Sequence, residues 1–434
     1  MKRVCILGLG YIGLPTASML ASKGFDVYGT DINQMAVDTI NSGNIHIEEP
    51  ELQNLVKTVI DSGKLKAYTK PQESDIYIIA VPTPVKDDKS ACMDCVESAA
   101  NSIVHLLKPG NLVILESTSP PETTKNILIP ILEKSNLKIG EELFVAYCPE
   151  KVLPGKIINE LVKNQRIIGG INEKSAQMAK EMYMSFVEGE IFLTDSTTAE
   201  MVKIMENTYR DVNIALANEL AKISEKLEIN AWDVIKFANL HPRVNIHSPG
   251  PGVGGHCISV DPWFIVEKYP DLANLISTAR NINDSMPEYT YELILQQIKN
   301  ISNPKITILG ITYKPDIDDI RESPSIEVVK MLEATSELKV FVHDPHVKYY
   351  NYKLSDFETA VEDSDCIVLM VNHSEFKNIN PAEISKLVKN KVIIDTRNAL
   401  NKKDWEEHGF KYVLLGNGKN DFISAKTIEY SKIN

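Results

Sequence analysis

The chain has 434 residues, which is too long for one ordinary hydrophobic core and predicts two or three domains. Its apolar content of 43% and charged content of 24% are typical of a globular protein. The formal net charge of −13 repels phosphate backbones, and no basic patch offsets it, so nucleic acid is not an expected partner.

The chain passes directly from Met1-Lys2-Arg3 into an apolar run that is too short for a signal peptide. No later stretch approaches the length of a membrane span. We therefore expect a cytoplasmic protein with no membrane partner, whose six cysteines are thiols. Cys92-x-x-Cys95 has no second pair or histidine motif to complete a ligand set, so no metal is expected.

Short β-rich runs alternate with amphipathic stretches through the first part of the chain. This alternation predicts βαβ units and a parallel sheet. The runs are Val4–Leu7, Asp26–Gly29, Ile76–Val81, Leu112–Glu116 and Leu143–Ala146.

The middle of the chain changes character. Thr198–Lys226 contains no Pro or Gly and predicts one long helix, and residues 231–300 stay mostly helical outside the loop Ser248–Gly255. A second βαβ pattern follows, with strands predicted at Lys305–Gly310, Lys339–His343, Cys366–Val371 and Lys391–Asp395.

The predicted fold class is α/β, with two Rossmann-like, doubly wound parallel-sheet domains joined by a long central helix and a helical middle domain. The predicted domain bounds are 1–197, 198–300 and 301–434.

The motif Gly8-Leu9-Gly10-Tyr11-Ile12-Gly13 lies between a predicted strand and a predicted helix. Its glycines permit the turn, the approach of a pyrophosphate and close helix–strand packing, and the helix N-terminus attracts the phosphates. Asp31 ends the second strand, where an acid binds ribose hydroxyls. Because its carboxylate repels a 2′-phosphate and no Arg follows it, we expect NAD and not NADP as the cofactor.

Two further strand ends should border the same crevice, because ligands bind beyond the carboxyl ends of parallel strands. They are Val81-Pro82-Thr83-Pro84 and Glu116-Ser117-Thr118-Ser119. Read alone, each is equally compatible with an ordinary turn.

Three segments carry candidate catalytic residues. Lys203 and Asn207 are spaced i, i+4 and share one face of the long helix. Cys257 follows a Gly- and Pro-rich turn that begins at Gly250 and permits close approach of a ligand. Glu150 places a carboxylate after the strand that ends near Ala146.

With these residues, the chain resembles the UDP-glucose/GDP-mannose dehydrogenase family over essentially its whole length, and within it the branch that acts on N-acetylated sugars. The stretches that carry the resemblance are Gly8–Ala17, Val81–Pro84, Glu116–Ser119, Ala146–Ile157, Glu200–Leu220, His241–Phe264 and Gly310–Pro324.

The resemblance implies a role for each matching residue. Cys257 is expected to be the nucleophile, Lys203 and Asn207 to hold the substrate oxygen with Asp261 as their neighbour, and Thr118 and Glu150 to position or activate water. The expected cofactor contacts are Gly8, Gly10, Tyr11, Ile12, Gly13, Asp31, Val81, Pro82, Thr83, Ser117, Thr118 and Arg321. The expected substrate contacts are Glu150, Lys151, Val152, Leu153, Lys203, Asn207, Arg243, Gly254, Gly255 and Lys314.

One residue departs from the branch, because Lys151 stands where an Arg is usual. Lys keeps the charge but loses the bidentate fork, which puts an anion clamp there in doubt. Arg243 is expected to reach a sugar hydroxyl or acetamido group, and the alternative for it is a loop arginine paired with local carboxylates.

The implied reaction is a four-electron oxidation of a UDP-sugar, first of all UDP-N-acetyl-D-mannosamine, to a uronate used for surface polysaccharide precursors. Thiolate addition to the intermediate aldehyde gives a thiohemiacetal that is oxidised to a thioester. The base for the first step is either a water held by Asp261 or a transiently neutral lysine. Assembly as a homodimer or a higher homo-oligomer through the central helices is expected.

Alternatives remain open. UDP-N-acetylglucosamine or UDP-glucose is a competing substrate. A single-step hydroxyacid dehydrogenase also uses Lys and Asn on a central helix, but needs neither Cys257 nor a C-terminal nucleotide domain. A catalytically silent nucleotide-sugar sensor would not need the intact Lys203, Asn207 and Cys257.

Overall fold

The structure is a computed structural model that describes residues 2–47, 49–86, 88–153, 155–348 and 354–418. These residues form two compact units. The first unit takes in 1–207 together with 263–273, and the second takes in 208–262 together with 274–434, in each case for the part of the range that the structure describes.

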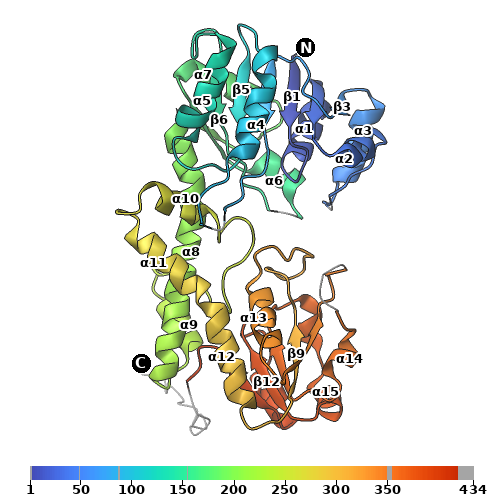
Figure 1. Ribbon diagram of the computed structural model, residues 1–434, viewed down its shortest axis with the longest axis vertical. Helices are drawn as coiled ribbons and strands as arrows, with labels where there is room; N and C mark the ends of the chain where they lie inside the picture. The colour runs from blue at the N-terminus through green and yellow to red at the C-terminus, as the bar shows by residue number, and fades with distance from the viewer. Residues whose placement is uncertain (1, 48, 87, 154, 349–353, 419–434) are drawn as a thin grey trace, which may run out of the picture. The chain divides into compact units, whose positions relative to one another are not determined.

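The first unit contains an eight-stranded sheet in the order β3-β2-β1-β4-β5-β6-β7-β8 (Figure 1). The strands are β1 Arg3–Leu7, β2 Asp26–Thr30, β3 Leu65–Tyr68, β4 Ile76–Ile79, β5 Leu112–Leu115, β6 Phe144–Tyr147, β7 Arg166–Gly170 and β8 Ile191–Asp195. Every pairing is parallel except that of β6 with β7, which is antiparallel.

Helices cover both faces of this sheet. Along β1, Val4 and Ile6 point into one apolar core and Cys5 and Leu7 into the other, as the two-residue period of a strand requires. The first core packs against α1 Gly13–Ser22, α2 Gln34–Asn41, α3 Leu52–Asp61, α6 Ile157–Lys163 and α7 Glu173–Tyr183. The second packs against α4 Asp94–Ile103 and α5 Ile129–Leu132. The predicted doubly wound fold is confirmed.

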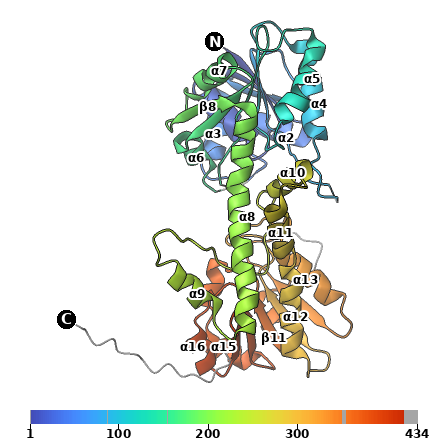
Figure 2. The ribbon, with the colours of Figure 1, turned by 90° about the vertical axis from the view of Figure 1, so that its left-hand side faces the viewer.

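The predicted long helix is also confirmed. It is α8, a continuous helix of 31 residues over Ser196–Lys226, which begins two residues before the predicted start (Figure 2). The helices after it are α9 Ala231–Ala238, α10 Asp261–Lys268, α11 Asn274–Asp284 and α12 Met286–Ile298. Within the second unit, buried Asp211 on α8 accepts hydrogen bonds from Arg280 and Asn283, which fixes α11 against it.

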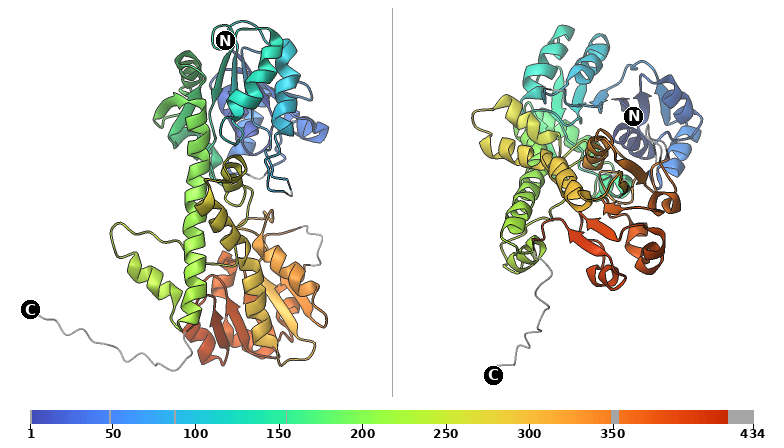
Figure 3. Two further views of the ribbon diagram at one scale, coloured as in Figure 1. Left: turned by 60° about the vertical axis from the view of Figure 1, so that its left-hand side comes forward. Right: turned by 60° about the horizontal axis from the view of Figure 1, so that its bottom comes forward.

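The second unit contains a five-stranded, fully parallel sheet in the order β10-β9-β11-β12-β13 (Figure 3). Its strands are β9 Lys305–Leu309, β10 Lys339–His343, β11 Cys366–Leu369, β12 Val392–Asp395 and β13 Lys411–Leu414. The core on one face includes residues of α12 and α13 Pro324–Glu333, and the other face is covered by α14 Phe357–Val361, α15 Pro381–Leu387 and α16 Lys402–Glu407.

Each sheet has a point where the strand order reverses, between β1 and β4 in the first and between β9 and β11 in the second. In open α/β sheets, ligands bind beyond the carboxyl ends of the strands at such points. The fold therefore offers one candidate ligand crevice in each unit.

Candidate functional sites at the two sheet edges

In the turn between β1 and α1, each glycine is needed for a different physical reason. Gly8 has φ +92° and leaves no room for a β-carbon, which would lie 2.4 Å from the Ala80 carbonyl oxygen. A β-carbon on Gly13 would lie 1.8 Å from the Gly8 carbonyl oxygen, so this glycine allows the helix to pack closely on the strand. A β-carbon on Gly10 would meet nothing within 4 Å. Gly10 thus faces open space, which fits a site where a pyrophosphate approaches the backbone.

Asp31 follows β2 and joins the glycine turn to the next helix. One carboxylate oxygen accepts a hydrogen bond from the Leu9 amide at 3.0 Å, and the other accepts from the Asn33 amide at 2.9 Å. Each oxygen keeps a further lone pair for a ribose hydroxyl. The neighbouring Ile32 is 96% exposed and cannot compensate a 2′-phosphate. The residues present therefore fit NAD.

The two predicted strand-end loops lie against each other. The Ser117 hydroxyl bonds to the amide and the carbonyl of Val81, and the Thr83 hydroxyl donates to the Thr118 carbonyl at 2.7 Å. The ends of β4 and β5 are thereby held together beside the β1 turn, where Thr118 stays half-buried. This arrangement places the predicted cofactor-contacting segments at one edge of the sheet.

The first part of α8 carries Lys203 and Asn207 in the first unit. Lys203 is half-buried and Asn207 is buried. Three residues before Lys203, the buried Glu200 accepts hydrogen bonds from the Glu122 and Thr124 amides, which anchors the loop that follows Ser119. Burial is the largest influence on Glu200 and raises the pKa of its carboxyl.

The segment after β6 carries the predicted Glu150. Glu150 is buried, and one of its oxygens accepts from the Arg166 guanidinium at 2.7 Å. Lys151 forms an ion pair with Glu206 on α8. This pairing neutralises the positive charge that an anion clamp would need. Val152 is half-buried and Leu153 is exposed. Sequence reasoning missed Arg166 altogether.

The Cys257 turn belongs to the second unit. Cys257 is half-buried, and its carbonyl accepts the amides of Val260 and Asp261, so the thiol sits one turn before α10 begins at the buried Asp261. The preceding glycines pack on the chain itself. A β-carbon at Gly254 would lie 2.4 Å from the Glu322 carbonyl oxygen, and one at Gly255 would lie 2.8 Å from the Tyr313 ring. The expected reason for these glycines, close approach of a ligand, therefore has a competing explanation in the packing of residues 313–324.

That same segment carries the two predicted contacts of the C-terminal part. Lys314 follows β9 and is exposed. Arg321 is exposed, pairs with Asp319 through its guanidinium, and accepts the Gly255 amide on its carbonyl. Arg243 is exposed in the loop after α9.

A buried hydrogen-bond network fixes the Lys314 loop at the reversal point of the second sheet. His373, after β11, is fully buried and accepts the Asp316 amide on Nδ1 at 2.9 Å. Its Nε2 lies 3.1 Å from the buried Asp344 carboxylate and 3.2 Å from the Thr312 hydroxyl. Burial acts to raise the pKa of Asp344, but bonds from His373 and from backbone amides hold it below its usual value.

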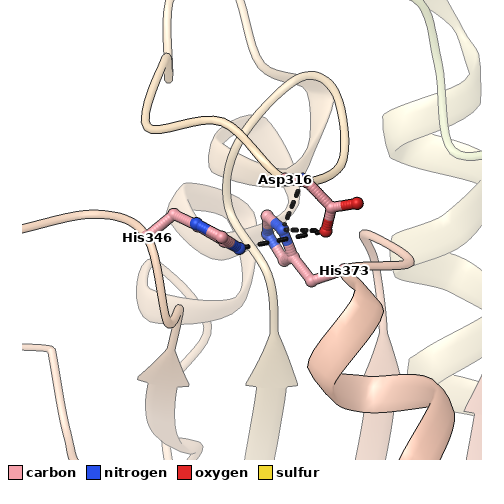
Figure 4. A group of neighbouring side chains, drawn as sticks. All are labelled: Asp316, His346 and His373. Atoms are coloured by element: carbon pink, nitrogen blue, oxygen red, sulfur yellow. Dashed lines mark hydrogen bonds and ion pairs between the residues drawn. The ribbon is translucent and has the colours of Figure 1, made fainter. Parts of the chain in front are cut away.

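Asp316, His346 and His373 also lie near one another, with ligand atoms within 4.8 Å (Figure 4). Such a group invites assignment as a metal site. However, both ring nitrogens of His373 are already engaged, Nδ1 by an amide and Nε2 by Asp344. A metal ion would have to break one of these bonds, so the group is better explained as the network that shapes the Lys314 loop.

Taken together, the first sheet defines a dinucleotide-binding fold, and the strand-order reversal of the second sheet offers a separate candidate ligand site. Comparison with known proteins gives the family. The chain matches the NAD binding domain of the UDP-glucose/GDP-mannose dehydrogenase family over residues 2–187, its central domain over 197–285 and its UDP binding domain over 307–402. The chain belongs to this family and is an NAD-dependent dehydrogenase.

Individual relatives cover almost the whole chain. A UDP-N-acetyl-D-mannosamine dehydrogenase of Methanococcus vannielii is 53% identical over 96% of this chain and 98% of its own. An NDP-N-acetyl-D-galactosaminuronic acid dehydrogenase of Ralstonia solanacearum is 45% identical over 91% and 96%. The solved UDP-N-acetyl-mannosamine dehydrogenase of S. aureus has a TM-score of 0.89, with 48% identity over 96% of this chain and 99% of that one.

Within the described part of the chain, no helix has the length and apolar character needed to cross a membrane.

Proposed function

We propose that this protein oxidises UDP-N-acetyl-D-mannosamine to the corresponding uronate in two steps that share one covalent intermediate on Cys257. The observation that carries the proposal is the half-buried Cys257 thiol one turn before α10, in a chain whose first sheet fits NAD. The relatives described above at 53% and 45% identity, one named for N-acetyl-D-mannosamine and the other for N-acetyl-D-galactosaminuronic acid, support an N-acetylated sugar.

The chemistry explains why a thiol is needed. NAD accepts a hydride in each oxidation when it is bound. The first oxidation leaves an aldehyde, whose carbon must become tetrahedral before it can lose a second hydride. Addition of the Cys257 thiolate gives that tetrahedral carbon as a thiohemiacetal, and its oxidation gives a thioester. Water then attacks the thioester and releases the acid.

The other predicted residues supply charge and orientation in this proposal. Lys203 and Asn207 stabilise the negative charge that develops on the substrate oxygen at each tetrahedral stage. Asp261 holds the water that accepts the first proton, or Lys203 accepts it while transiently neutral, and Thr118 and Glu150 serve the hydrolytic water. Lys314 contacts the diphosphate and Arg321 the cofactor, while Arg243 reaches the sugar.

The substrate proposal is tested by supplying UDP-N-acetyl-D-mannosamine, UDP-N-acetylglucosamine, UDP-glucose and GDP-mannose separately and counting NADH per sugar consumed. Two NADH per UDP-N-acetyl-D-mannosamine is the expected result. Preference for another sugar refutes the substrate, and one NADH with release of aldehyde refutes the covalent route. No turnover of any sugar favours a nucleotide-sugar sensor.

The nucleophile is tested with Cys257→Ser. Because serine is a far weaker nucleophile than a thiolate, acid formation should be lost while circular dichroism and the thermal midpoint stay unchanged. Cys95→Ser is the matched control, since Cys95 is an exposed thiol on α4. Acid production by Cys257→Ser at the rate of the control would remove Cys257 from the mechanism.

The proposal also covers the domain division, the cellular location and the assembly of the protein. We divide the chain into a cofactor domain at 1–197, a central domain at 198–300 and a UDP-sugar domain at 301–434. We place the protein in the cytoplasm, because a catalytic thiol at Cys257 needs a reducing compartment to stay free. We infer that it is a homodimer that assembles through its central helices.

A further inference from the structure

A buried polar cluster lies at the ends of three neighbouring strands of the first sheet. Glu116 follows β5, Glu150 comes just after β6, Arg166 begins β7, and Tyr183 ends α7. All four are at least nine-tenths buried. β6 and β7 run antiparallel with Tyr147 opposite Gly169, and the chain that continues past β6 runs back along β7, which brings Glu150 beside Arg166.

The contacts in this cluster are unequal for the two carboxyl groups. Arg166 donates to Glu150 at 2.7 Å, and its other terminal nitrogen lies 3.8 Å from the Cys148 sulfur. Glu150 also accepts the Lys151 amide on its second oxygen at 2.7 Å. Glu116 accepts only the Tyr183 hydroxyl, and its other oxygen has no hydrogen-bond partner among the described residues.

One guanidinium therefore faces two buried carboxyl groups. A second buried carboxylate without a donor would be costly, so one of the two groups should keep its proton. Burial raises the pKa of Glu116 to about 7, the nearby Glu150 acts in the same direction, and Arg166 and Tyr183 oppose both. The remaining groups that face the cluster do not titrate near neutrality, since burial raises the pKa of Cys148 to about 12 and that of Tyr183 well above its usual value.

From this geometry we propose that Arg166 is a positioning residue that holds Glu150 as an oriented carboxylate for thioester hydrolysis, and that neutral Glu116 leaves the charge of Arg166 to Glu150. The inference rests on the proposed function, since it assigns Glu150 to the hydrolytic water. It adds two residues, Arg166 and Glu116, that act through Glu150.

The assisted step balances as follows. The water oxygen bonds to the thioester carbon while Glu150 accepts one water proton, and the carbon–sulfur bond then breaks with its electron pair on the Cys257 sulfur. The proton on Glu150 is then released to water, the Cys257 sulfur is left as the thiolate, and the second water proton leaves when the product acid ionises. Both preceding hydride transfers are complete at this stage, so a defect in Glu150 should slow only the hydrolysis.

Arg166→Met tests the positioning role in the full-length enzyme with NAD and UDP-N-acetyl-D-mannosamine. We expect a normal first-turnover burst of two NADH per site, followed by a steady-state rate about 10- to 100-fold below that of the wild type. This loss is smaller than the full rate factor of general-base catalysis, because Glu150 itself is retained. Mass spectrometry of quenched enzyme should then show the sugar acyl group accumulating on Cys257. Arg3→Met is the control, since it removes an exposed arginine ion pair elsewhere on the first sheet.

Equal losses in the burst and in the steady state would mean that Arg166 is merely structural, and hydrolysis at the control rate would mean that it has no role; either result overturns the inference. If Arg166→Met does not fold, Arg166→Lys decides. It keeps the charge but loses the planar fork, so the acyl adduct should accumulate to a lesser extent. Absence of the adduct in a folded Arg166→Lys enzyme, with a wild-type steady state, also overturns it.

The pH dependence of hydrolysis tests Glu116. In the wild type, hydrolysis should slow as the pH rises above about 7, where ionised Glu116 competes with Glu150 for Arg166. Glu116→Gln imitates the neutral acid, so this decline should disappear. A decline of the same size in Glu116→Gln removes Glu116 from the proposal.

Failure of the proposed function gives a different pattern. If the wild type oxidises another UDP-sugar, only the substrate assignment falls, and the hydrolysis tests are made with that sugar. If the wild type forms no acyl enzyme from any of the sugars, the proposed function and this inference fall together.

Discussion

At the scale of single residues, Asp31 decides which dinucleotide fits. Its two oxygens already order the turn through Leu9 and Asn33, so the carboxylate is fixed before the cofactor arrives. Asp31→Asn removes the charge and turns an amide toward a backbone amide, so we expect the KM for NAD to rise about tenfold or more, which corresponds to roughly 1.4 kcal/mol.

This prediction is measured by steady-state kinetics with NAD and with NADP. Asp38→Asn is the control, because Asp38 is an exposed acid on α2 that accepts a hydrogen bond from the Gln34 side chain. The ratio of kcat/KM for NAD to that for NADP should fall only in Asp31→Asn. An unchanged ratio would show that the cofactor preference is set elsewhere.

Glu116 also gives a prediction for stability. Its pKa is raised to about 7 in the folded state, mainly by burial, against 4.5 as the ordinary value. A raised folded pKa contributes stability that is fully present below the unfolded pKa and is lost as the pH rises through the folded pKa. The free energy of unfolding should therefore fall between about pH 4.5 and 8, by on the order of 3 kcal/mol from this residue.

Urea unfolding of the wild type and of Glu116→Gln at pH 5 and pH 8 measures this effect. The substituted protein should lose less stability between the two pH values, since glutamine does not ionise. Parallel pH profiles for the two proteins would contradict the assignment of a buried, neutral Glu116.

At the scale of elements, the β1–α1 turn separates a glycine needed for ligand access from one needed for packing. Gly10→Ala places a methyl group in open space and should leave the thermal midpoint unchanged while NAD binding is lost. Gly13→Ala drives a methyl group against the Gly8 carbonyl oxygen and should lower the midpoint itself. Calorimetry of both proteins with and without NAD distinguishes them, and equal destabilisation by the two substitutions would contradict the assignment.

The strands also show how much of the fold can be predicted from the sequence alone. Apolar runs with helical stretches between them predicted most of the parallel strands, because burial on both faces makes such strands continuously apolar. β3, β7, β8 and β13 were missed. β8 is exposed at several positions, and β7 pairs antiparallel with β6 through two residue pairs only, so neither has the pattern of a central strand.

The candidate sites were also predictable only in part. Glycines and Asp31 have fixed spacing in the chain, so the cofactor turn was recognisable from sequence. The pairing of Arg166 with Glu150 depends on an antiparallel strand contact, and that of His373 with Asp344 depends on strand order. Neither leaves a local signal, since a lone Arg before an apolar run is an ordinary strand start.

At the scale of the whole molecule, α8 and the residue that follows it leave an apolar stripe exposed. Tyr209, Leu216 and Ile223 on α8 and Leu227 just after it are 46–62% exposed. At 100° per residue they fall within a stripe about 40° wide, the pattern of a helix face that packs on a partner. We infer that the partner is a second copy of this chain, as the expected homodimer requires, because an unpaired stripe of this kind is unusual on a monomer.

Leu216→Glu tests this assembly by placing a charge in the middle of the stripe. Burying an unpaired carboxylate costs several kcal/mol, enough to dissociate a dimer at micromolar concentration. Sedimentation equilibrium should give a dimer for the wild type and a monomer for Leu216→Glu. Lys226→Glu changes the charge on the same helix about 80° around the axis from Leu216 and outside the stripe, so it should remain dimeric. A monomeric wild type, or a Leu216→Glu protein that stays dimeric, would show that this stripe does not join two copies.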